Sequence, residues 1–121
     1  MNSKIATGSL GEDIAVKHLK RKKYKIIARN YQTNSGEIDI VCKKAGVIIF
    51  IEVKTMRQNG DYGDPFEKVN YYKAKKLMQN AMIYLIQNDY PEDRPWQIDV
   101  ISVELNYQTR KAKIRHLKDV I

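Results

Sequence analysis

Five consecutive apolar residues, Val47 to Ile51, restrict the fold of this chain more than any other feature of its sequence. A strand that is apolar on both faces is typical of the middle of a sheet with helices on each side. The next three residues, Glu52-Val53-Lys54, place a carboxylate and an ammonium group near the end of that strand. Ligand sites of open α/β sheets usually lie at the ends of central strands. We therefore expect a buried central strand that ends in a functional site.

A second acidic segment, Glu37-Ile38-Asp39, also lies in an apolar run. Side chains alternate along a strand, so Glu37 and Asp39 share one face, as do Glu52 and Lys54. An ionised carboxylate in a buried strand costs several kcal/mol unless a partner stabilises it. If the two strands are neighbours, the acids and the lysine converge on one patch. The pattern predicts a metal site with a lysine beside it, or an unusual ion pair.

Hydrophobic periodicity and turn residues predict the remaining elements of an α/β fold. The sequence Ser9-Leu10-Gly11-Glu12 resembles a capping box near the start of the first helix. Short turns at 33–36 and 44–46 predict an antiparallel meander, whereas the long second helix implies a crossover between parallel strands. A mixed central sheet between helices follows, in one domain of 121 residues, with a polar loop at 56–65. The expected elements are a helix at 5–23, strands at 24–31, 37–43 and 47–55, a helix at 67–88, and strands at 96–105 and 111–117.

The charge of the chain limits the kinds of molecule it is expected to bind, and its cysteine content limits the cellular compartments in which it is expected to work. Lys and Arg number 22 against 14 Asp and Glu, which gives a net charge of +8 and favours nucleic acid over an anionic membrane surface. The apolar runs are too short to span a membrane, and residues 1–12 lack the apolar core of a secretory signal. The single cysteine, Cys42, lies in a strand pattern and is expected to be a small buried side chain. A cytoplasmic location fits these features.

The acids of the two strands favour a hard cation. Asp39 and Glu52 offer oxygen ligands, and no nearby segment supplies the Cys or His that zinc prefers. Mg²⁺ or Mn²⁺ is therefore expected, with the Val53 carbonyl, water and substrate phosphate in the other ligand positions. Lys54 would hold the attacking water or stabilise an anionic transition state. This arrangement suits phosphodiester hydrolysis.

Asp39 followed by Glu52-Val53-Lys54 resembles the D…(D/E)xK signature of the PD-(D/E)XK nuclease superfamily, in its Holliday-junction-resolvase-like branch. A longer pattern is similar to the bacterial YraN-like family over nearly the whole chain. The resemblance implies a restriction-endonuclease-like α/β sandwich, a divalent metal and cleavage of DNA. The longer pattern comprises Gly8, Gly11-Glu12, Ala15, Asn30-Tyr31, Gly36 to Ile40, Ile49 to Lys54, Gly63-Asp64-Pro65, Val69, Lys73, Tyr84-Leu85 and Asp99-Val100.

The resemblance also assigns roles to individual residues. It implies that Asp39 and Glu52 are metal ligands and that Lys54 is the catalytic lysine. Glu12 matches an acid that resolvase-like members place on the first helix near the metal, although a capping-box partner of Ser9 explains Glu12 equally well.

Three further polar residues have open roles. Glu37 is either a neighbour of the metal ligands or a solvated strand residue. Gln97 and Asp99 alternate on one strand, and one of them could face the site. Here the chain departs from the Arg-Phe-Asp type of sequence that is usual in the family.

Two functions remain open. The first is a metal-dependent endonuclease acting on branched or structured DNA, with a homodimer as the assembly that the resemblance to resolvases implies. The second is a non-catalytic DNA-binding module that assists recombination or repair partners. His18 and His116 stand alone in the sequence and are expected to be structural. The residues expected to contact DNA phosphates are Lys20, Arg21, Arg57, Lys68 and Lys73.

Overall fold

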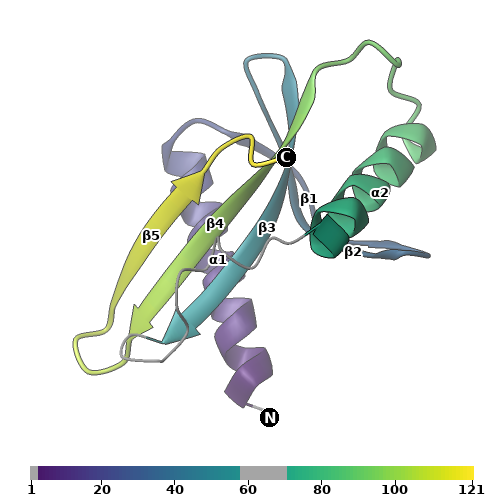
Figure 1. The fold of residues 1–121 in the computed structure, drawn as a ribbon. Helices are drawn as coiled ribbons and strands as arrows, with labels where there is room; N and C mark the ends of the chain where they lie inside the picture. The colour runs from purple at the N-terminus through teal and green to yellow at the C-terminus, as the bar shows by residue number, and fades with distance from the viewer. Residues whose placement is uncertain (1–2, 58–70) are drawn as a thin grey trace.

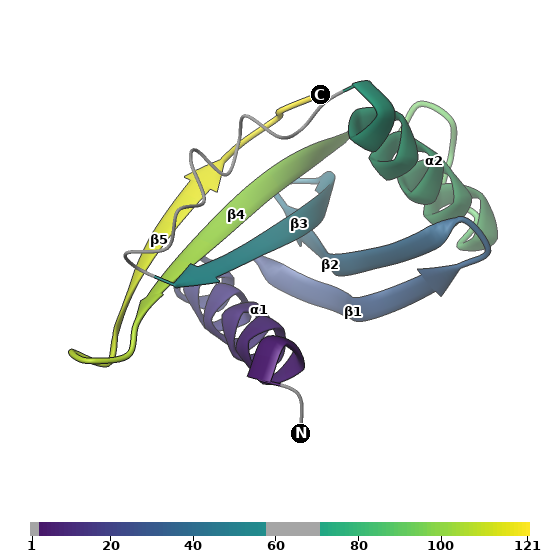
Figure 2. The same cartoon turned by 60° about the horizontal axis from the view of Figure 1, so that its bottom comes forward.

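The computed structural model describes residues 3–57 and 71–121. Its centre is a five-stranded mixed sheet in the order β1-β2-β3-β4-β5, with one helix on each face (Figures 1 and 2). The elements are α1 (Ser3–Arg21), β1 (Lys25–Thr33), β2 (Gly36–Lys44), β3 (Val47–Arg57), α2 (Tyr71–Gln87), β4 (Trp96–Asn106) and β5 (Lys111–Leu117).

The strand directions confirm the predicted α/β architecture. The strands β1, β2 and β3 form an antiparallel meander. The chain then returns through α2, and β4 pairs parallel to β3, as expected for a crossover. The last strand, β5, pairs antiparallel to β4. The apolar run of β3 therefore lies in the middle of the sheet.

Alternation along β3 explains why that strand is apolar on both faces. Ile49 and Ile51 pack toward α1, whereas Ile48 and Phe50 pack toward α2. All four are at most 4% exposed, so each face of the strand contributes to a separate core. The α1 core contains Ala15, Val16, Leu19, Tyr24, Ile40, Cys42, Ile49, Ile51, Ile101, Val103 and Leu105. The α2 core contains Ile38, Val41, Ile48, Phe50, Ala81, Tyr84, Leu85 and Ile98.

A buried amide fixes the tip of the β1–β2 hairpin against α2. Asn80 is 5% exposed, and its Oδ1 accepts hydrogen bonds from the Thr33 hydroxyl at 2.9 Å and the Ser35 hydroxyl at 2.7 Å. Lys76 adds a hydrogen bond from its Nζ to the Ser35 carbonyl oxygen at 3.1 Å. These contacts hold the start of β2, and with it the acidic segment Glu37-Ile38-Asp39, at a defined place against α2.

Several predicted boundaries differ from the observed ones by one or two residues, and two of these differences change an interpretation made from the sequence. The first helix begins at Ser3, so Ser9 lies inside α1 and does not cap it. The third strand continues through Met56 to Arg57, because both residues pair with β4. The rest of the predicted 56–65 loop and the predicted helical residues 67–70 lie outside the described residues. In the described parts of the chain, no helix is both long enough and apolar enough to cross a membrane.

Candidate metal centre

The β2–β3 ladder stops where the acidic segment of β2 begins. Pairing runs from Lys44 opposite Val47 to Ile40 opposite Ile51. Beyond that point the hairpin diverges from β3, as Figure 2 shows. The Val53 amide, which a continued ladder would place opposite Ile38, instead donates to Asp39 Oδ2 at 2.8 Å. A side-chain carboxylate thus takes over the role of a strand backbone, and Asp39 is fixed between the separating strands.

A kink in the hairpin accompanies this change. Asn30 has φ 50°, a left-handed conformation that Asn tolerates better than most residues. It lies opposite Asp39, between the paired positions Arg29–Ile40 and Tyr31–Ile38. Ile38 packs in the α2 core and Ile40 in the α1 core, although residues two apart normally share a face. The hairpin therefore changes faces at Asp39.

Gly11 allows α1 to approach β3 beside this kink. It is buried, and a Cβ built on it would lie 2.8 Å from Cβ and Cγ2 of Thr55 and closer still to its hydroxyl oxygen. Only a residue without a side chain fits there. The next residue along the helix is Glu12, which this close approach carries to the open end of the β2–β3 ladder.

Three carboxylates come together at that place. One oxygen each of Glu12, Glu37 and Asp39 lies within 4.8 Å of the others. Asn30 links two of them: with its amide turned to donate, its nitrogen is 3.1 and 3.2 Å from the Glu12 oxygens and 2.7 Å from Glu37 Oε1. Gln32 Nε2 donates to Glu37 Oε2 at 2.8 Å. We call Glu12, Glu37 and Asp39 the acidic triad.

The electrostatics of the acidic triad are unfavourable for negative charge. Burial raises the pKa of Asp39 to about 7, and Glu52, Glu12 and Glu37 add to the rise, against the hydrogen bond from the Val53 amide. Burial also raises the pKa of Glu12, as does Glu37, whereas Arg29 and Asn30 lower it. Carboxylates crowded in this way are stabilised by protonation or by a bound cation.

Glu52 lies near the acidic triad but makes different contacts. Its Oε1 is 3.5 Å from the Lys54 Nζ and 3.3 Å from the Lys73 Nζ. All three side chains are partly buried. The expected pairing of Glu52 and Lys54 on one face of β3 is therefore present. The negative charge of Glu52 also helps to raise the pKa of Asp39, as expected for two carboxylates that lie near each other.

The residues expected to contact DNA lie in different parts of the structure. Lys20 and Arg21 are exposed in the last turn of α1. Arg57 is exposed at the end of β3, and its guanidinium lies 5.0 Å from the ring centroid of Tyr107. Lys73 is next to Glu52, as described above. Lys68 lies outside the described residues.

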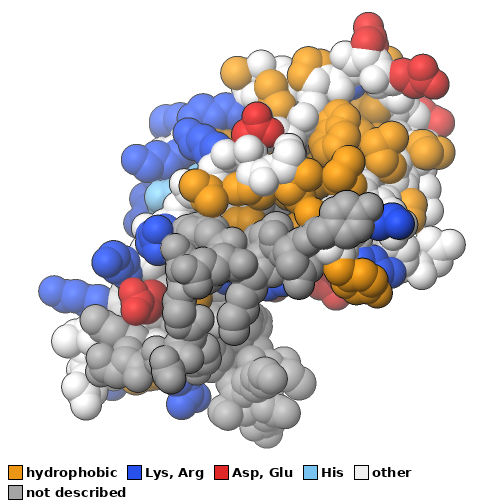
Figure 3. Space-filling model, viewed as in Figure 1, with side chains coloured by type: hydrophobic (Ala, Val, Ile, Leu, Met, Phe, Trp, Pro, Cys, Tyr) orange, Lys and Arg blue, Asp and Glu red, His pale blue; other side chains and the backbone are white. Residues whose placement is uncertain are grey.

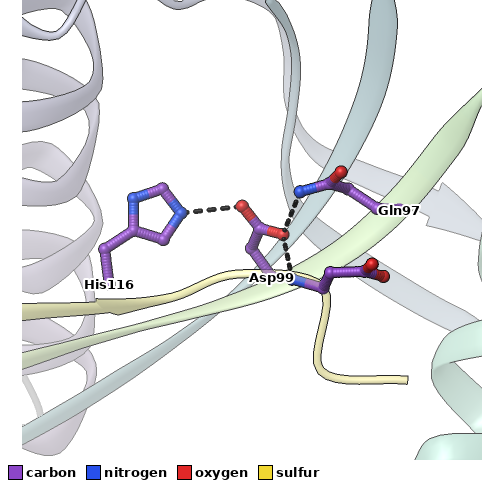
Figure 4. Close-up of polar contacts among 4 residues, drawn as sticks. Gln97, Asp99 and His116 are labelled. Carbon is purple, nitrogen blue, oxygen red and sulfur yellow. Dashed lines mark hydrogen bonds and ion pairs between the residues drawn. The ribbon is translucent and has the colours of Figure 1, made fainter.

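Asp99 and Gln97 belong to a separate polar network (Figure 4). Asp99 is fully buried, and its Oδ2 is 2.7 Å from His116 Nε2. Its Oδ1 accepts hydrogen bonds from Gln97 Nε2 and from the Asp119 backbone amide, both at 2.9 Å. Burial alone would raise the pKa of Asp99, but the hydrogen bonds from His116, Asp119 and Gln97 outweigh it and lower that pKa. Gln97 or Asp99 was expected to face the acids of the candidate metal centre. In the described part of the structure, neither residue makes a contact with those acids.

Sequence reasoning placed Asn30 in the family pattern but gave no role to this residue, which kinks the hairpin and bridges two acids. Asn is a poor strand former, and its place in an otherwise typical strand was the available signal. The sequence allows Glu37 either a role at the site or plain solvation, and the structure places it in the acidic triad. Glu12, which a capping box could have explained, also belongs to that group.

Residues 11–103 match the family described as "Uncharacterised protein family UPF0102". The chain belongs to this family. A UPF0102 protein of Alkaliphilus oremlandii is 40% identical over 119 residues, which cover 98% of each chain. One from Clostridium beijerinckii is 40% identical over 112 residues, covering 93% of this chain and 89% of the relative. One from Caldanaerobacter subterraneus subsp. tengcongensis is 36% identical over 116 residues, covering 95% and 93%. The acidic triad, Glu52 and Lys54 all lie within the region that the UPF0102 family shares.

Proposed function

We propose that this UPF0102 protein is a metal-dependent DNA endonuclease of the PD-(D/E)XK superfamily, resolvase-like branch, which hydrolyses phosphodiester bonds in branched or structured DNA. The observation that carries the proposal is the acidic triad, with Glu52 beside it, in a chain of net charge +8. Acids that face a polyanion oppose DNA binding unless a cation neutralises them. A metal-dependent nuclease holds such a cation at the bond that it cuts.

The donor set fits Mg²⁺ or Mn²⁺. Asp39, Glu52 and the Val53 carbonyl would hold the ion, with Glu12 and Glu37 as further oxygen donors beside Asp39. All are hard oxygen ligands of the kind these ions prefer. The raised pKa of Asp39 supports the fit, because a cation relieves the repulsion that causes part of that rise. When bound, the ion supplies Lewis-acid activation of water and neutralises charge on the phosphoryl group.

The remaining chemistry belongs to side chains of this chain. Hydrolysis adds water to the phosphorus and breaks one ester bond, so the water loses a proton and the departing oxygen gains one. Solvent water would take up the proton of the attacking water and protonate the departing oxygen, while Glu12 stays beside the ion as an oxygen donor. Lys54, held 3.5 Å from Glu52, stabilises the negative charge that builds on the phosphate oxygens.

Binding of DNA would use the positive charge outside the acidic triad. Lys20, Arg21 and Arg57 are exposed and, with Lys68 and Lys73, contact phosphates in this proposal. The 121 residues act as a single nuclease domain in the cytoplasm. Two copies form a symmetric dimer, because a four-way junction needs two matched cuts.

Cleavage assays with single substitutions test the proposal. The substrates are a four-way junction, a flap, single-stranded DNA and linear duplex, each with Mg²⁺ or Mn²⁺ and with EDTA. Asp39→Asn and Lys54→Ala are expected to abolish a cleavage that wild type shows. Glu92→Gln and Lys111→Ala, which change exposed side chains far along the sequence from the site, serve as matched controls. Salt-sensitive DNA binding without cleavage of any substrate would refute the enzyme, and cleavage unaffected by either site substitution would indicate a contaminant.

A non-catalytic DNA-binding module is the second candidate, and two ion pairs favour it. Lys54 and Lys73 both lie close enough to Glu52 to offset its charge. A module that assists recombination or repair partners would bind DNA through its basic surface, and its acids would have only a structural role. Mn²⁺ binding separates the two functions, because only the nuclease requires the acidic triad to bind the ion. Electron paramagnetic resonance of Mn²⁺ would detect that binding in wild type and its loss in Asp39→Asn.

A further inference from the structure

A second group of titratable side chains lies between the end of α1 and the end of β5, away from the acidic triad. It surrounds a pocket of about 230 Å³, which we call the basic pocket. At roughly 30 Å³ per water molecule, this volume exceeds that of several waters and admits a small polyatomic anion. Figure 3 shows a histidine side chain among Lys and Arg side chains on this side of the molecule. The lining residues are His18, Lys22, Tyr24, Lys44, His116 and Lys118.

The lining of the basic pocket carries one sign of charge. It contains three lysines and both histidines of the chain, and none of its lining residues is acidic. The His18 and His116 rings lie with their centroids 6.3 Å apart. Burial lowers the pKa of His18, and the charges of His116, Lys22 and Arg21 lower it further. The group thus mirrors the acidic triad: cations are crowded together, and an anion would stabilise them.

Two of the side chains that line the basic pocket are held in place by the fold. Lys44 Nζ donates to the Lys22 carbonyl oxygen at 2.8 Å and lies 4.5 Å from the centroid of the Tyr24 ring. An ammonium group has three N–H donors, so this arrangement leaves donors for a ligand. His116 is oriented by its contact with Asp99 through Nε2, so its other ring nitrogen, Nδ1, is the one open to a second partner. Pre-positioned donors of this kind reduce the cost of binding.

The carbonyl groups at the end of α1 do not oppose an anion here. A helix C-terminus carries partial negative charge on its free carbonyl oxygens. In this chain the His18 and Leu19 carbonyls accept hydrogen bonds from the Lys22 amide, and Leu19 also accepts from the Tyr24 amide. The Lys22 carbonyl accepts from Lys44, as above. The negative end of the helix is therefore covered by donors, and positive side chains face the pocket.

The basic pocket is distinct from the acidic triad. On β2, Lys44 and Asp39 are five residues apart, about 16 Å along a strand at roughly 3.3 Å per residue. On α1, His18 contacts β5 through His116, whereas Glu12 contacts the β1–β2 hairpin through Asn30. The two sites thus lie at different ends of the same sheet.

We propose that the basic pocket is a second ligand site, which binds a phosphate group through the lysine ammonium groups and the two imidazoles. The phosphate could be a free ion, part of a nucleotide, or the terminal phosphate of a nucleic-acid strand, and all three present the same charged oxygens. If the phosphate belongs to the end of a nucleic-acid strand, this site rests on the nucleic-acid binding proposed above. The basic pocket would then bind the strand end at a place separate from the acidic triad, where cleavage is proposed.

The two histidines make a direct assay possible, because the chain contains no others and both line the pocket. The side-chain NMR signals of His18 and His116 would be followed while sulfate or inorganic phosphate is added at constant ionic strength. Saturable shifts of both imidazoles are expected. Shifts that rise linearly, or that an equal ionic strength of sodium chloride reproduces, would overturn the proposal.

Charge reversals test the role of the lysines. Lys118→Glu and Lys22→Glu are each expected to weaken sulfate binding about tenfold or more, because each places a carboxylate in the pocket. Lys25→Glu is the matched control: Lys25 is exposed one residue after Tyr24, does not line the pocket, and changes the net charge equally. Equal weakening by all three variants would show a nonspecific charge effect and refute the site. Mn²⁺ binding at the acidic triad should be unchanged in all three variants. Sulfate binding therefore tests the basic pocket, and Mn²⁺ binding tests the proposed nuclease site independently.

Sulfate also reports the protonation of the pocket, since it remains a dianion over the range in which histidines titrate. Its affinity is expected to rise as the pH falls and His18 gains a proton, and this rise should come below the ordinary histidine range because the pKa of His18 is lowered. A pH-independent affinity would exclude protonated His18 as a ligand. The charged or titratable groups that face the two imidazoles are Asp99 from β4, Arg21 and Lys22 at the end of α1, Tyr24 before β1, Lys44 from β2 and Lys118 after β5.

The source of the phosphate is distinguished by three ligands in the same assay: inorganic phosphate, a nucleoside monophosphate, and one oligonucleotide with either a 5′-phosphate or a 5′-hydroxyl. Tighter binding of the 5′-phosphorylated strand than of its 5′-hydroxyl form, with shifts of both histidines, would support the site and identify a strand end. Saturable binding of the small ligands without that preference would support the site as one for a free anion.

Discussion

Replacement of Asp39 by asparagine is expected to stabilise the metal-free protein at alkaline pH, although it removes a candidate functional group. A rise in the pKa of Asp39 from 3.8 to about 7 corresponds to about 4 kcal/mol of unfavourable free energy for the ionised side chain. Asparagine keeps an acceptor for the Val53 amide but loses a charge-assisted hydrogen bond, which offsets about 1–2 kcal/mol. The expected net gain for Asp39→Asn is about 2–3 kcal/mol at pH 8.

The sign of the pH dependence is part of the same prediction. Because the pKa of Asp39 is higher in the folded than in the unfolded protein, the folded state binds more protons between about pH 7 and pH 4. Wild type therefore gains stability as the pH falls through 7 toward 4, and Asp39→Asn lacks this gain. The difference between the two proteins should accordingly shrink or reverse near pH 5.

Urea unfolding in EDTA at about pH 8 and pH 5 measures both effects, with Glu92→Gln as a control that removes one exposed carboxylate. Addition of Mn²⁺ at pH 8 should then stabilise wild type and leave Asp39→Asn unchanged. A variant that is less stable than wild type at pH 8 would refute the reasoning. So would a difference between them that is the same at both pH values.

Three further substitutions test the packing around the two sites. Gly11→Ala should cost about 1–3 kcal/mol in urea unfolding, because its methyl group would overlap Thr55, and a Thr55→Gly change in the same protein should recover part of the loss. Asn80→Ala should cost a similar amount by removing the buried acceptor at the hairpin tip, with faster amide exchange in the β1–β2 turn as the local measurement. Asp99→Asn should cost about 2–3 kcal/mol at pH 7 by weakening the bond to His116. Since the folded pKa of Asp99 is lowered, this difference should disappear as the pH falls through that pKa, and unfolding curves at several acidic pH values would show it.

The fold was predictable because its strongest signals are local. The apolar run of β3 requires cover on both faces, and the periodic helix after it requires a crossover. The boundaries that failed depend on distant partners. Ser9 has the chemistry of a cap, yet the helix continues through it, and Gly11, a poor helix former, packs against Thr55. Met56 has no strand signal of its own and is in β3 because Glu104 pairs with it.

The candidate site was predictable only in part. Strand alternation correctly placed Glu52 beside Lys54 and Glu37 beside Asp39. It could not show that Asn30 kinks the hairpin, because alternation assumes a regular strand. Whether Asp39 and Glu52 share an ion stays a prediction.

The histidine pair was beyond local sequence reasoning altogether. His18 lies on the first helix and His116 on the last strand, and no local sequence pattern links the two. Their proximity depends on where α1 crosses the sheet relative to β5. Local patterns carry no information on that crossing, so the basic pocket became visible only in the folded chain.

The change of faces at Asp39 has a consequence for how the protein unfolds. On one side of Asp39 the β1–β2 hairpin contributes Ile40 and Cys42 to the α1 core and Val41 to the α2 core, and on the other side it contributes Ile38 to the α2 core. Opening either core must disturb the same two strands, so neither helix can detach without loosening the support of the other. Amide exchange of α1 and α2 should therefore report a shared opening free energy, as expected for one cooperative unit rather than two.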